Sequence, residues 1–151
     1  HPVQIAHERD DRIKRLAGKI DRVLVDAPCS GLGTLRRNPD LKWRQSPESV
    51  AEMAIKQAAI LVSAARLLKP GGRLVYATCS LLAAENEAIA AAFENHMAEA
   101  RGATFTALPA EEVLTRAHVQ DAASLVRGPY LRLWPHRHGT DGFFAAVWQR
   151  D

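Results

Sequence analysis

The sequence predicts an α/β fold in which helices cover the faces of one sheet. Two apolar runs rich in β-branched residues, DRVLVDAPCSG at 21–31 and GGRLVYATCS at 71–80, are typical of buried strands. A long stretch with helical spacing separates them, and a second helical stretch follows the second run. Two strands joined by a crossover helix are normally parallel neighbours, so both runs are expected to end at one edge of the sheet.

The N-terminal part is expected to hold a helix and the first strand. Residues 8–18 carry apolar side chains at helical spacing and place acidic residues before basic ones, which suits the helix dipole. Residues 22–28, RVLVDAP, form an apolar run that predicts a buried parallel strand ending at Pro28. A polar loop rich in Gly, Arg and Asn-Pro is expected to follow.

The crossover helix has a start signal and a stop signal. Ser46 provides an N-cap, and Pro47 occupies the first helical position. Apolar residues then recur at helical spacing to about Leu68, where KPGG at 69–72 is expected to end the helix. Because no helix follows directly, the two glycines of this segment are interpreted as a stop and not as a phosphate-binding loop.

The remaining elements complete the sheet. Residues 73–79, RLVYATC, predict the second strand, and residues 84–97 predict a helix. The stretch TFTAL at 104–108 is a further strand candidate. YLRLWP at 130–135 and FFAAVWQ at 143–149 flank a Gly-containing segment of hairpin length, which predicts a C-terminal antiparallel hairpin.

Length and composition are typical of one globular domain. The chain has 151 residues, of which 47% are hydrophobic and 25% charged. Charged residues interrupt every apolar run before the roughly 18 residues that a spanning helix needs, so no membrane segment is expected. Two cysteines and no signal-peptide pattern favour a reducing, cytoplasmic location. The first residues, HPVQIAHERDD, lack a Met, which favours a piece of a longer chain.

Charge is distributed unevenly. Residues 1–80 carry 14 Lys and Arg against 8 Asp and Glu, whereas residues 81–151 carry 6 against 9. The basic half also holds both cysteines, which fits a polyanionic substrate such as nucleic acid. A modest positive excess is also ordinary in soluble proteins, and on charge alone that interpretation is favoured.

The two cysteines, Cys29 and Cys79, allow four interpretations: a disulfide, a metal site, inert core thiols or a catalytic pair. In a cytosolic protein, a disulfide would be an artefact or a regulatory state. The six histidines do not lie at zinc-ligand spacing around either cysteine, so no metal is expected. Inert thiols are the strongest alternative to catalysis, because cysteine is among the most buried residue types.

The residues around the cysteines favour catalysis. Asp26 ends the first apolar run three residues before Cys29, and a carboxylate there is costly unless it is paired or used. Pro28 stiffens the turn that presents Cys29, and hydroxyl residues flank Cys79. A thiolate is a carbon nucleophile, and a nearby carboxyl group can hydrogen-bond a heterocycle under attack.

The motifs together resemble the RNA cytosine-C5 methyltransferases of the Sun (Fmu) type, which modify ribosomal or transfer RNA with S-adenosylmethionine. The resemblance covers about residues 20–150 and includes the helix that contains Gln57. The paired PC and TC motifs, in this order, are its most specific part. The segments that carry it are IDRVLVDAPCSG at 20–31, RRNPDLKW at 36–43, LLKPGGRLVYATCS at 67–80, ENE at 85–87 and LWPHRHGTDGFF at 133–144.

The resemblance implies a Rossmann-like methyltransferase fold and assigns unequal roles to the two thiols. Cys79 would add to C6 of the target cytosine, and Cys29 would assist breakdown of the covalent adduct. Asp26 would hydrogen-bond the cytosine at N3 and its amino group, and Pro28 would help to shape the base pocket. Asp26 and Pro28 are also the residues of this chain expected at the S-adenosylmethionine site. The target base would have to leave its stack.

The loop after the first cysteine is expected to contact the RNA. Arg36, Arg37, Lys42 and Arg44 would bind phosphates, although a solvated run of charges is an equal alternative for each. Trp43, in the same loop, is interpreted as a packing residue.

Two further groups are interpreted as ordinary structure. Glu85 and Glu87 read as acidic residues in the first turn of a helix, where they suit the helix dipole. His136 and His138 lie in the hairpin loop near Asp141 and read as polar surface, although this loop would be within reach of RNA.

The chain lacks part of what the family pattern requires. It has no G-x-G-x-x-G-like loop, which the family places near its first strand to hold the cofactor. Residues 1–151 are therefore expected to be the C-terminal portion of a single catalytic domain, truncated at its first strands, inactive alone and able to self-associate through the bared edge of strand 22–28. The alternatives are a non-catalytic RNA-binding fragment and a thiol redox protein, although the chain has no C-x-x-C motif.

Overall fold

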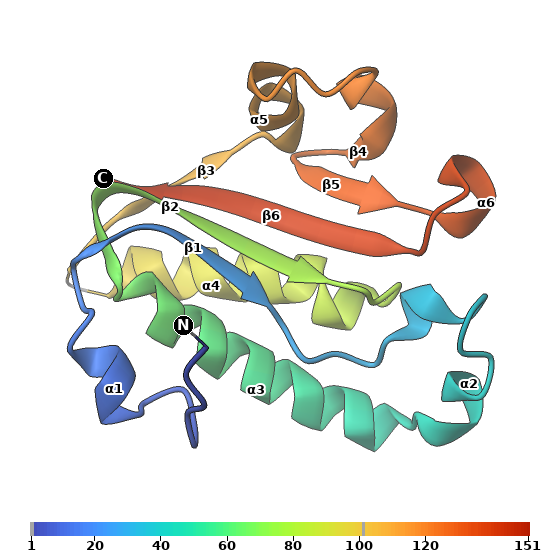
Figure 1. The fold of residues 1–151 in the computed structure, drawn as a ribbon, viewed down its shortest axis with the longest axis horizontal. Coiled ribbons are helices and arrows are strands. Elements are labelled where there is room, and N and C mark those ends of the chain that lie inside the picture. The colour runs from blue at the N-terminus through green and yellow to red at the C-terminus, as the bar shows by residue number, and fades with distance from the viewer. Residues whose placement is uncertain (1, 101) are drawn as a thin grey trace.

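A computed structural model describes residues 2–100 and 102–151 and contains one six-stranded sheet (Figure 1). The strand order is β1-β2-β6-β5-β4, and β3 pairs with β6 as well. The strands are β1 (Ile20–Asp26), β2 (Leu68–Thr78), β3 (Phe105–Leu108), β4 (Val126–Arg127), β5 (Tyr130–Leu133) and β6 (Phe143–Arg150).

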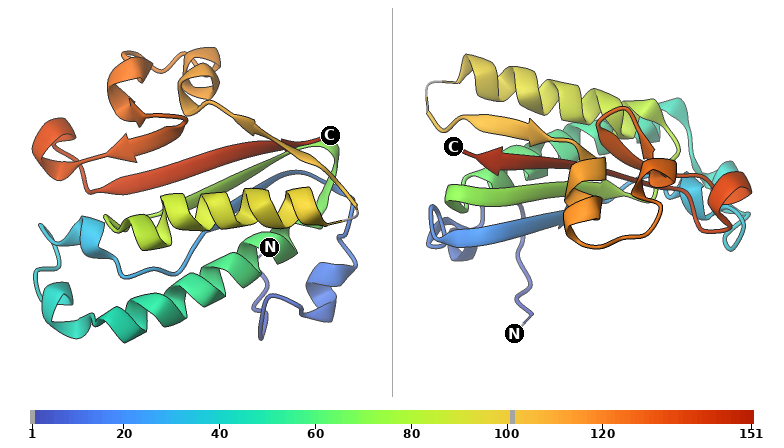
Figure 2. Two further views of the ribbon diagram at one scale, coloured as in Figure 1. Left: turned by 180° about the vertical axis from the view of Figure 1, so that it is seen from behind. Right: turned by 90° about the horizontal axis from the view of Figure 1, so that it is seen from above.

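Two long helices cover one face of the sheet, and shorter helices lie around its edges and on the other face (Figure 2). α5 contacts β5 and β6 on the face opposite to α3 and α4. The α/β fold is thus confirmed. The helices are α1 (Asp11–Lys14), α2 (Leu41–Arg44), α3 (Pro47–Ala65), α4 (Glu87–Glu99), α5 (Ala110–Arg116) and α6 (Pro135–His138), with short 3-10 turns at Leu32–Thr34, Ala83–Glu85 and Ala122–Leu125.

The strand pairing confirms two sequence predictions. β1 and β2 are parallel neighbours, with Asp26 opposite Ala77 at their carboxyl ends. β5 and β6 form the predicted C-terminal antiparallel hairpin, and β6 also runs antiparallel to β2. Among the described residues, no helix has both the length and the apolar character needed to cross a membrane.

The core lies between the sheet and the two long helices. Leu61 of α3, Leu74 and Tyr76 of β2, and Phe144 and Trp148 of β6 are completely buried. Burial of such a side chain contributes roughly 1.5–3 kcal/mol, so this layer fixes β2 and β6 firmly under the helices. The carboxyl end of β2 is therefore a rigid support for the residues that follow it.

The prediction that the first apolar run is a buried strand is wrong. β1 is an edge strand that ends at Asp26, before Pro28, and its Leu24 is 67% exposed. Only Val25 of this strand is buried, because α3 covers one face of β1 while the other face is open. Apolar composition predicts a strand but does not say whether both of its faces are covered.

Several boundaries also differ from the sequence predictions. The helix predicted at 8–18 is only four residues long, because the Asp10 carboxylate caps the backbone at Arg12 and only i to i+3 turns follow Lys14. α3 begins at Pro47 as predicted but ends at Ala65. The segment 69–72 belongs to β2, where it produces a register shift against β1.

Three helical segments differ from what the sequence indicated. The helix predicted at 84–97 is divided into a 3-10 turn that ends at Glu85 and α4, which begins at Glu87. α2 lies inside the loop that was predicted to be irregular, and α5 follows β3. These helices are too short to produce a clear hydrophobic period.

Candidate active site

The two cysteines meet where β1 and β2 end. Cys79 directly follows β2, and Cys29 lies three residues after the last residue of β1. Their sulfur atoms are 3.5 Å apart, and both side chains are free thiols that are partly buried. A disulfide requires about 2.05 Å, so the pair is in contact without a bond. The predicted proximity of the cysteines is confirmed.

A completely buried carboxylate lies beneath the pair. The Oε1 atom of Glu85 accepts the backbone N–H of Ser30 at 2.8 Å and the Nε2 of Gln57 at 3.1 Å. Its Oε2 accepts the hydroxyl of Ser30 at 2.5 Å and that of Ser80. We call these four residues the Glu85 cluster. Every contact of the carboxylate is with a donor, which is how a buried negative charge is tolerated.

The Glu85 cluster corrects the sequence interpretation of Glu85 as an ordinary first-turn acid. Its side chain is 0% exposed. Sequence reasoning missed Glu85 and its partner Gln57, because Ser30 and Gln57 lie 55 and 28 residues from Glu85 along the chain and the nearer partner, Ser80, has no distinctive spacing to it. The ENE motif and the helix that contains Gln57 were noted only as parts of a family resemblance.

A second set of hydrogen bonds fixes the turn after Cys79. Thr78 donates its hydroxyl to the Oδ1 of Asn86 at 2.5 Å, and Asn86 Nδ2 donates to the carbonyl of Ser80 at 2.9 Å. The buried Arg132 of β5 donates to the carbonyl of Leu81 at 2.9 Å. Asn86 and Arg132 therefore fix the backbone of the segment after Cys79, and the Glu85 cluster fixes the side chain of Ser80 in the same segment.

Backbone packing brings a third segment against Cys79. The amide of Gly33 donates to the carbonyl of Cys79 at 2.8 Å, and Gly142 in turn donates to the carbonyl of Gly33. A Cβ atom on Gly33 would lie 2.6 Å from the Cys79 oxygen and closer still to Gly142. Only glycine fits here, so the loop after Cys29 is packed tightly between β2 and the hairpin.

The environment changes the acidity of the Cys29 thiol. Burial, and next the adjacent Cys79 sulfur, raise the pKa of Cys29 to about 12. Cys29 is therefore a protonated thiol at neutral pH, and its S–H group lies within hydrogen-bonding range of Cys79. The Cys29 side chain is thus suited to hold a proton.

The predicted carboxylate and proline line the open side of the pair. Asp26 is exposed at the last position of β1, and Pro28 is exposed in the segment that leads to Cys29. In the described part of the chain, the Asp26 carboxylate has no side-chain partner within bonding distance, whereas the carbonyl of Pro28 accepts Gln57 Nε2 at 2.8 Å. These two residues are thus available to a ligand.

The basic residues of the loop after Cys29 fall into two groups. Arg36 binds the Asp141 carboxylate at 2.7 Å, and Arg37 pairs with the same carboxylate, so both guanidinium groups tie the loop to the hairpin. The acid is 105 and 104 residues away from them. In these pairs the side chains of Arg36 and Arg37 remain at least half exposed to solvent.

The other two basic residues lie in α2 and at its end. Lys42 lies 4.8 Å from the ring centre of Trp43, and Arg44 pairs with Asp40 at 2.8 Å. Trp43 is 80% exposed, so its interpretation as a packing residue is wrong. α2 lies outside the core, and an exposed indole beside two cations is a feature of surfaces that stack on nucleic acid bases.

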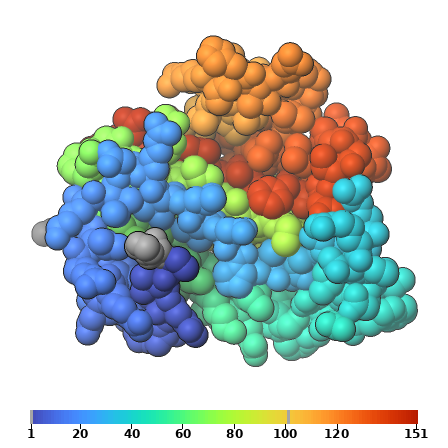
Figure 3. Space-filling model, in the orientation of Figure 1, coloured from blue at the N-terminus to red at the C-terminus, as the bar shows by residue number. Residues whose placement is uncertain are grey.

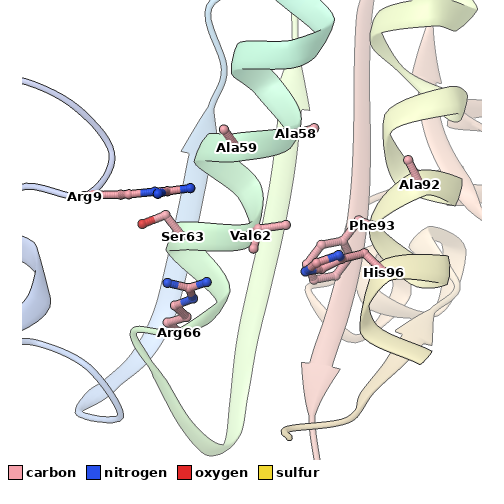
Figure 4. A pocket seen from close by; sticks show the side chains of 9 residues that line it. All are labelled: Arg9, Ala58, Ala59, Val62, Ser63, Arg66, Ala92, Phe93 and His96. Carbon is pink, nitrogen blue, oxygen red and sulfur yellow. The ribbon is translucent and has the colours of Figure 1, made fainter. Parts of the chain in front are cut away.

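The surface around the thiols is shared by three segments that are distant in sequence. In the space-filling view, the segment after β2 emerges between the loop that follows β1 and the C-terminal hairpin (Figure 3). Other hollows lie elsewhere. A cavity of about 330 Å³ between α3 and α4 is lined by Val62, Phe93 and His96 among others (Figure 4), toward the opposite end of the strands.

Comparison with known proteins gives one consistent result. A family model described as 16S rRNA methyltransferase RsmB/F matches residues 2–149. The chain is 44% identical over 145 residues to the putative methyltransferase Rv1407 of Mycobacterium tuberculosis, which covers 93% of this chain and 29% of the relative. It is 35% identical over 161 residues to the probable ribosomal RNA small subunit methyltransferase B of Bacillus subtilis, with coverage of 95% and 34%.

Solved structures agree with the sequence relatives. PH0851 superimposes with a TM-score of 0.73 at 39% identity, covering 87% of this chain and 27% of that protein. NSun6 from Pyrococcus horikoshii, determined with SFG, gives a TM-score of 0.70 at 25% identity and covers 98% and 34%. The chain thus spans about a third of the length of the relatives it matches.

The raised pKa of Cys29 generates a pH prediction. In the variant Cys79→Ala, which leaves Cys29 as the only cysteine, the rate of iodoacetamide alkylation should titrate well above pH 9, because burial is the largest cause of the shift and remains. The unfolded chain ionises first, near 9.0, so folding stability should fall as pH rises from about 9 toward 12. Alkylation rates and melting temperatures across this range provide the measurement.

The same variant in denaturant is the control, since its thiol should then titrate as an ordinary cysteine. An apparent pKa near 9 in the folded variant would contradict the raised pKa of Cys29.

Proposed function

We propose, on the premise that this chain belongs to the 16S rRNA methyltransferase RsmB/F family, that it carries the thiol half of an active site that methylates C5 of cytosine in RNA. The observation that supports this most directly is the contact of Cys29 and Cys79 at the carboxyl ends of two parallel strands. Ligands bind at this edge in open α/β sheets.

The proposed reaction uses the two thiols in sequence. The Cys79 thiolate forms a bond to C6 of the cytosine, which makes C5 nucleophilic enough to accept a methyl group. The C5 proton is then lost, and the bond between C6 and sulfur breaks to free the enzyme. Cys29 takes part in this release, a role that suits a thiol that stays protonated near the departing sulfur.

Asp26 is proposed to orient the base. Its exposed carboxylate lies at the end of β1, beside the segment that carries Cys29, and can accept hydrogen bonds from the cytosine amino group and from a protonated N3. A preformed acceptor at this position stabilises the ring as it develops charge. Pro28, exposed two residues later, would form one wall of the base pocket.

Asp26 and Pro28 are also proposed as this chain's contacts with the cofactor. The family is one of S-adenosylmethionine-dependent methyltransferases, and the bound cofactor supplies an electrophilic methyl group. An exposed carboxylate without a side-chain partner in the described residues fits a cationic ligand. Glycine-rich loops of the dinucleotide-binding kind do not occur in the sequence, so this chain would hold only one side of that ligand.

The RNA would approach over the loop after Cys29. Lys42 and Arg44 extend from α2, and Arg36 and Arg37 are half engaged with Asp141, so all four can contribute to phosphate binding. Ribosomal RNA in the cytoplasm is the proposed substrate, since relatives of this chain are described as ribosomal RNA small subunit methyltransferases.

Residues 1–151 are proposed to form the C-terminal part of one catalytic domain, and alone to be inactive. This follows from the span of about a third of the relatives and from the open edge and face of β1. Two other functions remain as alternatives, an RNA-binding fragment without catalysis and a thiol redox protein. The adduct experiment below separates them from the proposal.

The first prediction concerns the covalent adduct. In the intact enzyme that contains this chain, RNA with 5-azacytosine at the target should become covalently attached through Cys79, because its ring nitrogen in place of C5 carries no proton that could be lost to break the bond between C6 and sulfur. Cys79→Ala should abolish the adduct, whereas Cys29→Ala should leave or prolong it. Denaturing gels and peptide mass spectrometry provide the measurement, and the opposite pattern would reverse the assigned roles.

The second prediction concerns the cofactor. Calorimetric titration of the 151-residue chain with S-adenosylmethionine should show weak binding or none, since only one side of the site is present. The intact enzyme is the control and should bind with a defined stoichiometry. Tight equimolar binding by the short chain would count against the division of the site proposed above.

The third prediction concerns self-association. β1 offers a free edge and the exposed side chain of Leu24, and bare apolar edges recruit partners. Light scattering of the 151-residue chain should therefore show dimers or larger species at high concentration. Leu24→Lys should reduce them, while Ile55→Lys, an equally exposed position on α3, should not. A wild-type monomer at high concentration would disprove the association.

A further inference from the structure

Glu85 binds the residue that directly follows each cysteine. Ser30 follows Cys29 and Ser80 follows Cys79, and both hydroxyl groups donate to the same oxygen, Oε2. The two hydroxyl oxygens are themselves only 3.2 Å apart. One carboxylate oxygen thus joins the ends of two strands that are 50 residues apart in sequence.

Two more hydrogen bonds hold Glu85, one to its carboxylate and one to its backbone. Gln57, on α3, donates to Oε1, and Tyr76, on β2, donates its hydroxyl to the backbone carbonyl of Glu85 at 2.6 Å. Gln57, Tyr76 and Glu85 belong to the buried part of the molecule, where water does not compete for these bonds. Glu85 is therefore a fixed point against which both cysteine-bearing turns are placed.

Apart from each other, the thiols are positioned by backbone groups, since the Cys29 sulfur also interacts with the backbone of Gly31 and of Cys79. In the part of the chain that the structure describes, the side-chain hydrogen bond of each sulfur is to the other sulfur. Their separation must then be set by the backbone of the two turns. Ser30 and Ser80 provide that control one residue away, through Glu85.

We propose that Glu85 is a positioning residue that sets the distance between Cys29 and Cys79. This role rests on the proposed function, in which the Cys79 sulfur bonds to C6 and the Cys29 thiol acts beside that sulfur as it departs. The two thiols must therefore stay within contact distance when the bond between C6 and sulfur breaks. Productive geometry in such sites must be held to about 0.5 Å, which side-chain packing alone does not provide at an exposed edge.

The positioning role can be tested by measuring the effective concentration of one thiol for the other, which is obtained from the equilibrium between the two free thiols and their disulfide. The 151-residue chain is equilibrated with glutathione buffers, in which two cysteine thiols become one disulfide while one oxidised glutathione becomes two reduced molecules. Glu85→Gln keeps the size of the side chain but replaces an acceptor oxygen with a donor. It should lower the effective concentration of Cys29 for Cys79 at least tenfold, measured by mass spectrometry of alkylated samples.

Glu94→Gln is the matched control. Glu94 lies on α4 and accepts the indole N–H of Trp148 at 2.9 Å, so the variant alters a carboxylate bond far from the thiols. Its thiol equilibrium should stay within twofold of the wild type. A purely structural role for Glu85 would lower the melting temperature of Glu85→Gln and leave its thiol equilibrium unchanged, which would overturn the proposal.

Two smaller variants keep the proposal testable if Glu85→Gln does not fold. Ser30→Ala and Ser80→Ala each retain the carboxylate and remove one hydroxyl from Oε2. Each should lower the effective concentration severalfold. Ser63→Ala, which removes a hydroxyl bond at the far end of α3, should not change it, and unaltered values in both cluster variants would also overturn the role.

The intact enzyme separates this inference from the function it rests on. If the wild type forms the Cys79 adduct and Glu85→Gln forms and releases it at the same rates, the positioning role fails while the function stands. If the wild type forms no adduct but the thiol equilibrium shifts as expected, the function fails and the geometric role of Glu85 stands.

Discussion

The buried carboxylate of Glu85 is the constraint on which the site depends. A charge removed from water is tolerated only if donors surround it, and an unsatisfied buried donor or acceptor costs on the order of 1–3 kcal/mol. Ser30, Gln57 and Ser80 supply those donors from three separate elements. The ends of β1 and β2 and the middle of α3 are therefore tied to one another, and the thiols follow from that arrangement.

The contact between the two cysteines was predictable, whereas the means of holding them was not. A crossover helix between two apolar runs fixes a parallel neighbour relation, and both runs end in a cysteine, so proximity follows from topology. Glu85, in contrast, lies just before a helix, where an acid is equally well explained by the helix dipole. Two of its partners, Gln57 and Ser30, lie 28 and 55 residues away, and the single nearby partner, Ser80, forms no local pattern that distinguishes the two cases.

The exposed face of β1 likewise could not be predicted from the local sequence. An apolar run of this kind is compatible with a strand covered on both faces or on one. An apolar side chain favours burial, but the composition of a segment does not say which other elements pack against it. Leu24 is 67% exposed although its neighbours in sequence are apolar, and Arg22 and Arg116 border the same surface. A surface of this composition is suited to a contact that residues 2–100 and 102–151 do not themselves supply.

The Glu85 cluster and the exposed residues at the end of β1 have different roles at the edge of the sheet. Beneath the thiols, the Glu85 carboxylate is buried and bonded to donors from Ser30, Gln57 and Ser80, so the two turns that carry Cys29 and Cys79 are fixed without any ligand. Above them, Asp26 and Pro28 are exposed and free to meet a ligand. The proposed function would benefit from this asymmetry, because rigidity is confined to the groups whose spacing matters and the exposed groups stay free to meet ligands. The bonds that place the two cysteine-bearing turns therefore lie within the described residues, although the buried Oε1 atom of Gln57 has no hydrogen-bond partner among them.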